Sequence, residues 1–524
     1  MTGLLEFAGR EQSRYVGATT AAYRKQRGQV FTPPEIARFM AGLFSRIPTR
    51  FRLLDPGAGA GSLAIAVCER ILSLRSPREV VVDVFETEPR LAEVLHRNLD
   101  HSRRELSKAG HRLTFTIHRG DFIAAASPYV DGQASLFGGP AVPDDYDAVI
   151  VNPPYFKVRK DSEHAKLMQR VVHGQPNAYA FFLALAARLL KPDGELVAIT
   201  PRSFCNGLYF RGFRHWFFQR MGLDHIHLFE SRTEAFKESD VLQESVITKS
   251  YRLGRPAKRV TITGSYGRNV SRRSEAQTLS HAEVVDDSCG EHMVKIPVTA
   301  DDCRIMRLIE ALPLRFEQTG LRISTGPVVT FRATDVILDR QNGESVVPLL
   351  MPHNIKPYRT QWPVQRKHHP VYIIDCEASR KRKLLIPVKN YVVLKRFSAK
   401  EEKRRLTAGC LLRAEQETER IGLENHLNYV YHADRELGED ETFGVAALFN
   451  SVLLDRYFRI LSGNTQVNAT EIRNLHFPPL ATLAAIGRDV RSLADRNGAV
   501  VERIVATALD VPGSLADCFI EELA

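Results

Sequence analysis

The chain has 524 residues, of which 44% are apolar and 25% are charged, and its formal net charge is +11. This length predicts two or three domains, and the composition is typical of a globular protein without extended low-complexity segments. No apolar run of about 18 residues is present, which argues against a membrane span, and the N-terminus lacks the pattern of a secretory signal peptide.

The cysteines bear on metal binding and on the redox compartment. All seven are scattered, their number is odd, and none forms a Cys-x-x-Cys pair. This pattern argues against both a disulfide framework and a zinc site. We therefore expect a cytoplasmic protein that holds no metal.

Short β-rich apolar runs alternate with helical patterns between residues 52 and 252. Strands are predicted at Arg52–Asp55, Val80–Glu86, Leu113–Asp121, Tyr146–Asn152, Glu195–Pro201, His225–Glu230 and Ser245–Arg252. Helices are predicted at Ser62–Leu74, Pro89–Ala109, Asn177–Leu190 and Phe210–Met221, the last closed by Gly222. Because such alternation builds βαβ units, we expect an α/β domain over residues 1–255 with a largely parallel sheet. Polar, Ser/Arg-rich sequence then marks a boundary before a second domain over residues 256–524.

Four successive strands of the predicted domain deliver small, polar or aromatic residues at their ends. These stretches are LLDPGAGAGSL (53–63), VFETEP (84–89), GDF (120–122) and NPPY (152–155). The carboxyl ends of parallel strands meet at one edge of a sheet, where α/β domains bind ligands. Glycines after the first strand let the backbone approach a ligand closely, but the dinucleotide spacing is absent, which argues against NAD. An acidic residue in the position of Glu86 commonly accepts hydrogen bonds from ribose hydroxyls.

The order GQVFTPPE (28–35), DPGAGAGSL, FETEP, GDF, NPPY resembles that of the gamma-class DNA adenine-N6 methyltransferases of restriction–modification systems. GLENHLNYVY (422–431) and SGNTQVNATEIRNL (462–475) are similar to stretches of type II members of that family. The resemblance implies a Rossmann-like S-adenosylmethionine-dependent methyltransferase domain, followed by a mixed α/β target-recognition domain. It also implies a monomer that acts on double-stranded DNA and is paired with a restriction endonuclease.

The resemblance assigns roles to individual residues. Thr32 would contact the methionyl end of S-adenosylmethionine, and Asp55, Gly57 and Gly59 would line the cofactor. Glu86 would hold the ribose with Thr87 beside it, Asp121 and Phe122 would hold the adenine ring, and Asn152 would reach the reactive end. Phe236 is the best match for a second aromatic residue against the target base.

The NPPY stretch is suited to methyl transfer onto the exocyclic amino group of adenine. An exocyclic amino nitrogen is a poor nucleophile because its lone pair is delocalised into the ring. The side-chain oxygen of Asn152 and the carbonyl of Pro153 can each accept one N6–H, which draws the nitrogen toward tetrahedral geometry. Pro154 helps to fix the direction of that carbonyl, and Tyr155 offers a face for stacking on an adenine extruded from the duplex.

The whole excess of positive charge lies in one segment of the C-terminal half. Residues 356–413 contain 16 Lys/Arg and 4 Asp/Glu, interleaved with aromatic residues. Such a one-signed block indicates contact with the phosphate backbone, and we assign this contact to Arg380, Lys381, Arg382 and Lys383. A solvated helix face is the alternative interpretation.

Other functions share parts of this pattern. NPPY also occurs in protein glutamine-N5 methyltransferases, but the basic C-terminal half has no role there. Cytosine-N4 methyltransferases usually carry Ser-Pro-Pro-Tyr. A DNA-binding subunit without activity would not need intact cofactor and NPPY motifs. A fused nuclease is also disfavoured. Glu401-Glu402-Lys403 has the Glu-x-Lys form of a nuclease site, but no Pro-Asp lies at a suitable distance on a neighbouring strand.

Overall fold

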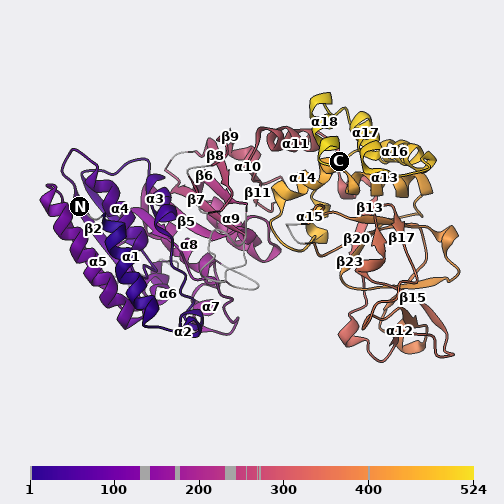
Figure 1. Ribbon diagram of the computed structural model, residues 1–524, viewed down its shortest axis with the longest axis horizontal. Coiled ribbons are helices and arrows are strands. Elements are labelled where there is room, and N and C mark those ends of the chain that lie inside the picture. Colours follow the sequence, from indigo (N-terminus) through magenta and orange to yellow (C-terminus); the bar gives the residue numbers. More distant parts are fainter. Residues whose placement is uncertain are drawn as a thin grey trace. The chain divides into compact units, whose positions relative to one another are not determined.

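The computed structural model describes residues 3–129, 142–171, 177–230, 244–254, 256–267, 269–270, 273–288, 290–398 and 402–523. The chain divides into two compact units, Met1–Thr299 and Ala300–Ala524 (Figure 1). No helix within the described residues is long and apolar enough to cross a membrane.

The first unit is built on a nine-stranded sheet in the order β3-β2-β1-β4-β5-β7-β6-β8-β9. Its strands are β1 (Arg50–Asp55), β2 (Glu79–Phe85), β3 (Arg112–His118), β4 (Tyr146–Val151), β5 (Leu190–Pro201), β6 (Met221–Phe229), β7 (Ser245–Arg252), β8 (Arg259–Ser265) and β9 (Gln277–Ser280). Its helices are α1 (Leu4–Gly17), α2 (Ala21–Gln26), α3 (Pro34–Gly42), α4 (Ser62–Leu72), α5 (Pro89–Lys108), α6 (Phe122–Ala126), α7 (Glu163–Leu167), α8 (Ala178–Leu189), α9 (Arg211–Phe218) and α10 (His281–Val284). A small ribbon of β10 (Val285–Asp286) and β11 (Met293–Val294) completes the unit.

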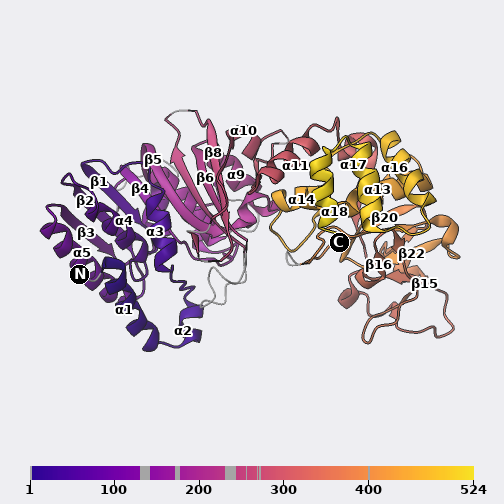
Figure 2. The ribbon, with the colours of Figure 1, turned by 45° about the horizontal axis from the view of Figure 1, so that its top comes forward.

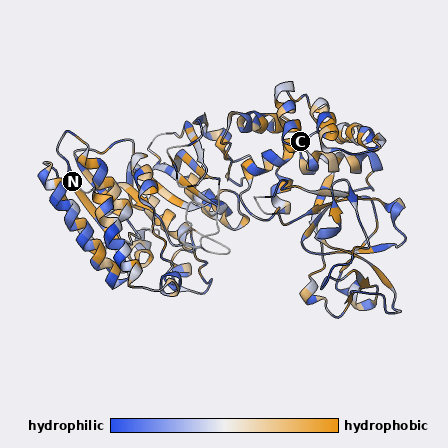
Figure 3. Cartoon of the chain, viewed as in Figure 1, coloured by the Kyte–Doolittle hydropathy of each residue, from blue (hydrophilic) through white to orange (hydrophobic). Residues whose placement is uncertain are grey.

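Helices cover both faces of this sheet. Alternate residues of β2 (Val80, Val82 and Val84) are fully buried in one cluster with apolar residues of α1, α3, α4 and α5, and Figure 2 shows α3 and α4 over the strands. Helix α5 buries its apolar stripe and exposes its polar stripe. Figure 3 colours the apolar residues of this helix orange and the polar residues blue. On the opposite face, Phe85 of β2 packs edge-on against Phe122 of α6, with ring centroids 5.2 Å apart. Strands β3, β2, β1, β4 and β5 are mutually parallel.

The predicted strands and helices of this unit are all present, with bounds shifted by a few residues, and the α/β class is confirmed. Two details were wrong. Gly222 does not close a helix but lies inside β6, where a Cβ would come 2.6 Å from the Tyr251 ring. The boundary predicted at 255/256 moves to 299/300, because β8 pairs in parallel with β6 and continues the same sheet.

The second unit is a mixed α/β structure, as predicted. It contains a four-stranded sheet in the order β13-β23-β20-β21, a five-stranded sheet in the order β14-β18-β15-β22-β19, and C-terminal helices. The strands are β12 (Leu314–Arg315), β13 (Leu321–Thr325), β14 (Ile337–Leu338), β15 (Val346–Leu350), β16 (Ile355–Lys356), β17 (Arg359–Thr360), β18 (Tyr372–Ile374), β19 (Leu385–Pro387), β20 (Tyr391–Lys395), β21 (Ala408–Leu411), β22 (Arg420–Leu423), β23 (Leu427–His432) and β24 (His476–Phe477). The helices are α11 (Ala300–Glu310), α12 (Glu377–Lys381), α13 (Glu439–Asn450), α14 (Val452–Leu461), α15 (Ala469–Arg473), α16 (Leu480–Ser492), α17 (Gly498–Ala508) and α18 (Gly513–Glu521).

Candidate active site

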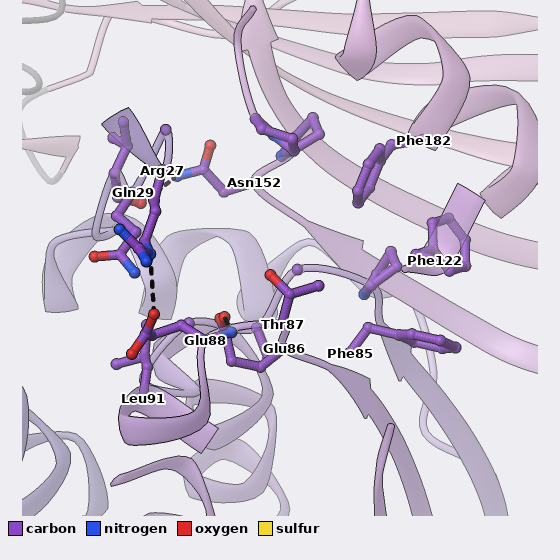
Figure 4. Close-up of a pocket in the computed structure, with 18 of the residues that line it drawn as sticks. Arg27, Gln29, Phe85, Glu86, Thr87, Glu88, Leu91, Phe122, Asn152 and Phe182 are labelled. Carbon is purple, nitrogen blue, oxygen red and sulfur yellow. Dashed lines mark hydrogen bonds and ion pairs between the residues drawn. The ribbon is translucent and has the colours of Figure 1, made fainter. Parts of the chain in front are cut away.

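A cavity of about 700 Å³ opens at the carboxyl ends of β1, β2 and β4 (Figure 4). Its volume lies within the range of small-molecule sites. Most of the predicted site residues line it: Thr32, Gly57, Gly59, Glu86, Thr87, Asp121, Phe122, Asn152, Pro153, Pro154 and Tyr155. Phe236 and Glu401 lie outside the described residues.

The glycine turn between β1 and α4 brings bare backbone to the cavity wall. The amide of Ala58 donates to the carbonyl of Phe85 at 3.0 Å, which ties the turn to β2. Gly59 adopts a left-handed conformation with φ of 56°, which a side chain would strain. A Cβ on Gly57 would stand 3.6 Å from the Phe182 ring, so a side chain there would take up cavity space. This turn therefore permits close approach of a ligand.

Glu86 presents a carboxylate to the cavity from the end of β2. One of its oxygens accepts the amide of Glu88 at 2.7 Å. Burial raises the pKa of Glu86, while the amides of Glu88, Gly59 and Thr87 act in the opposite direction. The group is thus a half-buried acceptor suited to ribose hydroxyls.

An ion pair that the sequence patterns did not predict stands on the same side of the cavity. Glu88 is buried, caps the N-terminus of α5, and accepts from Arg27 Nε at 3.0 Å and Tyr23 Oη at 2.9 Å. The guanidinium of Arg27 also lies 3.8 Å from the centre of the Tyr23 ring. These contacts hold the segment after α2 against the cavity. Glu88 before Pro89 is recognisable as a helix cap, but its cationic partner 61 residues away is not.

Phenyl rings form the opposite wall. Phe122 lies between Phe85 and Phe182 of α8, with centroid distances of 5.2 and 5.1 Å, and Figure 4 shows the three rings together, away from Arg27 and Glu88. Asp121 caps α6 by accepting the Ala124 amide at 2.8 Å, and its second oxygen lies 3.2 Å from His164 Nε2. Phe182 and His164 are cavity residues that sequence reasoning missed, because neither belongs to a strand-end motif.

The Asn152 carboxamide is held at both ends. Its Nδ2 donates to Thr32 Oγ1 at 3.0 Å and to the carbonyl of Val30 at 3.3 Å. Its Oδ1 faces the Tyr155 hydroxyl at 2.6 Å, and the same hydroxyl lies 2.9 Å from the carbonyl of Ile199. One hydroxyl proton cannot serve both acceptors fully. When the proton turns to Ile199, Oδ1 is open to another donor.

Asp55 differs from the other predicted residues because it does not line the cavity. It ends β1 directly behind the glycine turn and is completely buried. Burial raises the pKa of Asp55 to about 8, although the amide of Ala64 acts in the opposite sense. Its carboxyl group therefore keeps a proton at neutral pH.

We expect Asp55→Asn to flatten the pH dependence of stability. The folded pKa of about 8 lies above the unfolded value of about 3.9, so only the unfolded chain releases this proton between those values. The stabilisation is complete below about pH 4 and is lost as pH rises to about 8. Urea unfolding measures the free energy of unfolding at pH 5 and at pH 8. Between these two pH values, wild type should lose about 1–4 kcal/mol more of this free energy than the variant. Equal losses would mean that Asp55 is ionised in the folded chain.

The four cations predicted to contact DNA lie on and after the short helix α12. Three of them form ion pairs: Arg380 with Asp375 at 2.7 Å, Lys381 with Glu377 at 2.7 Å, and Arg382 with Asp335 at 2.8 Å. Lys383 follows with a positive φ of 54°. Three of the four cations thus have a carboxylate partner within the second unit, and their assignment to DNA stays a prediction.

The elements described so far define a Rossmann-like S-adenosylmethionine-dependent methyltransferase. The glycine turn, the Glu86 carboxylate and the phenyl wall line one cavity at the carboxyl ends of the parallel strands, where α/β domains bind ligands.

Comparison with known proteins gives the family. Residues 73–236 match the Eco57I restriction-modification methylase family. The chain is 35% identical to the Type II methyltransferase M.BsuBI of Bacillus subtilis over 93% of this chain and 94% of that one. It is 31% identical to M.PstI of Providencia stuartii over 89% and 90%. The DrdV–DNA complex resembles it with a TM-score of 0.47 and 14% identity, over 90% of this chain and 57% of that one. The chain belongs to the Type II methyltransferases of restriction–modification systems.

Proposed function

We propose that this methyltransferase modifies N6 of an adenine that is flipped out of double-stranded DNA. The observation that carries the proposal is the fixed carboxamide of Asn152 at the cavity. Both acceptors of its Nδ2 come from the segment before α3, so the amide is held with Oδ1 as its acceptor end. Oδ1 and the Pro153 carbonyl can then accept the two hydrogens of one exocyclic amine.

S-adenosylmethionine, when bound, supplies an electrophilic methyl group. The chain's own part is to position and polarise the amine. Acceptance of both N–H bonds by Asn152 and Pro153 localises the nitrogen lone pair and stabilises the positive charge that develops on it. Tyr155 yields Oδ1 by turning its hydroxyl proton to the Ile199 carbonyl, while its ring remains anchored. The ring then offers a face to the flipped base, which offsets part of the unstacking cost.

The proposal also covers how the DNA sequence is selected, where the enzyme acts and which enzyme it is paired with. We expect the second unit to select the DNA sequence, the enzyme to act as a monomer in the cytoplasm, and a cognate restriction endonuclease to cut unmodified DNA. A direct test is to incubate the purified enzyme with labelled S-adenosylmethionine and unmodified genomic DNA, followed by nucleoside mass spectrometry. The product expected is N6-methyladenine at one sequence. Label in N4-methylcytosine, or label in protein with none in DNA, would contradict the proposal.

Substitutions of Tyr155 separate its ring from its hydroxyl. Tyr155→Ala should reduce methylation of fully paired duplex most, and a mismatched target adenine should recover part of the loss because some unstacking cost is already removed. Tyr155→Phe keeps the ring and should retain most activity, since Ile199 and Asn152 lose only one shared donor. Steady-state rates on matched and mismatched duplexes measure this. Equal losses on both substrates would show that Tyr155 does not hold a flipped base. Phe236→Ala is the corresponding test of the predicted second aromatic.

A further inference from the structure

The cations of residues 356–413 fall into two structural groups. One group is already engaged: beside the ion pairs of α12, Arg404 donates to the carbonyl of Asn450, Arg413 donates to the carbonyl of Val388, and the buried Arg405 donates to Ser398 Oγ. These side chains hold the second unit together. Their charge is therefore less available to an outside partner than the charge of a cation without such contacts.

The side chains of the other group are not engaged in this way, and the group comprises Lys356, Arg359, Arg366, Lys367, Lys383, Lys389, Lys395 and Lys403. Three of them, Lys356, Arg366 and Lys395, act on one another electrostatically, and we call these three the cation triad. Among the described residues, none of the three side chains forms a hydrogen bond or an ion pair. Lys356 and Lys395 are half-buried, and Arg366 is exposed. The triad therefore holds three positive charges that no carboxylate of the described residues neutralises by direct contact.

Backbone pairing brings two members of the triad, Lys356 and Lys395, together. Lys356 lies in the β16–β17 hairpin, which is tied to β21 by the Tyr358 amide donating to the Ala408 carbonyl at 2.9 Å. Strand β21 pairs with β20, and the amide of Lys395 at the end of β20 donates to Thr407 at 3.1 Å. These pairings set Lys356 beside Lys395. Both residues lie on paired strands, so the spacing of their backbones is fixed by the fold.

The three charges act on one another. Burial lowers the pKa of Lys395, the charges of Lys356 and Arg366 lower it further, and Glu402 acts in the opposite sense. Burial also lowers the pKa of the neighbouring His353, on which Arg366, His369 and Lys356 act in the same direction. Like charges held this close repel each other, and a bound anion would relieve that repulsion.

We propose that Lys356, Arg366 and Lys395 contact the phosphate backbone of duplex DNA, in place of Arg380–Lys383. This proposal rests on the proposed function, since it takes DNA as the substrate. Unpaired cations release counterions from DNA when they neutralise phosphates, whereas cations already paired with carboxylates contribute little. The contact positions the duplex and carries no base information.

The test compares two variants that remove positive charge from the same segment. The first is Lys356→Gln, Arg366→Gln and Lys395→Gln, and the control is Arg380→Gln and Lys381→Gln, whose side chains are both paired with carboxylates. The control leaves Arg382 in place because it bonds to Asp335 and to the carbonyl of Arg332. Fluorescence anisotropy with a labelled duplex of mixed sequence, from about 50 to about 200 mM salt, measures the slope of log affinity against log salt.

The triad variant should reduce the magnitude of this negative slope by about 2.7, or about 0.9 per lost contact. Wild type should therefore lose about 40-fold more affinity than the variant over this range of salt concentration. The control should keep the wild-type slope. The single variant Arg366→Gln, at an exposed side chain, should lower the slope by about 0.9 without affecting folding. A wild-type slope in the folded triad variant, or a larger change in the control, would overturn the proposal. Failure of the proposed function is a separate outcome, because wild type would then transfer no methyl group to DNA whatever the slopes.

Discussion

Asn152→Ala should lower kcat for methyl transfer by about 100-fold or more while changing the affinity for S-adenosylmethionine only a few-fold. The variant removes an acceptor that acts on the target amine, and loss of such a preorganised group costs about 2.7 kcal/mol or more of barrier stabilisation. We expect cofactor binding to depend chiefly on other residues that line the cavity, Glu86 and the glycine turn. Single-turnover rates at saturating cofactor, together with calorimetric cofactor titration, measure the two effects.

Thr32→Val is the matched control for this substitution. It keeps the shape of the buried side chain but removes the Oγ1 acceptor, leaving Asn152 Nδ2 with the Val30 carbonyl alone. Loss of one hydrogen bond of about 1 kcal/mol should reduce kcat by about fivefold, far less than Asn152→Ala. If Asn152→Ala retains more than about one-tenth of the wild-type kcat, Asn152 is not the acceptor of the amine.

Glu86→Ala should weaken S-adenosylmethionine binding by about 10- to 150-fold, which corresponds to about 1.5–3 kcal/mol for charge-assisted hydrogen bonds. The ribose hydroxyls lose their acceptor, whereas DNA binding in the absence of cofactor should hardly change. The affinity of Glu86→Gln for S-adenosylmethionine should lie between those of wild type and Glu86→Ala, because glutamine keeps an oxygen acceptor without the charge. Isothermal titration calorimetry gives the three dissociation constants.

Glu79→Ala provides the matched control on the same strand. Glu79 begins β2 at the end of the strand opposite Glu86, is 45% exposed, and forms only surface ion pairs with Arg50 and Arg112. Surface pairs of this kind contribute little, so cofactor affinity should stay at the wild-type value. An unchanged dissociation constant in Glu86→Ala would show that the carboxylate does not hold the ribose.

The sequence by itself determined the elements whose signals are local. The alternation of apolar runs predicted seven of the nine strands of the first unit's large sheet, and the amphipathic pattern from Pro89 predicted α5. The strand-end motifs were predicted to share one cavity because parallel strands direct their carboxyl ends to the same edge, and eleven of the predicted residues line it. Asp55 is the exception, since its side chain is completely buried and does not reach the cavity.

Only the tertiary structure decided which distant residues meet. Asn152 finds its Thr32 acceptor 120 residues away, and Glu88 finds Arg27 61 residues away. In the second unit, β13 pairs with β23, which places Leu321 opposite His432, 111 residues away, and this pairing left no periodic signal. The basic segment shows the limit most clearly. Its composition revealed the charge, but paired and unpaired cations have the same sequence signature, because the carboxylate that neutralises a cation is chosen by the packing of the folded chain.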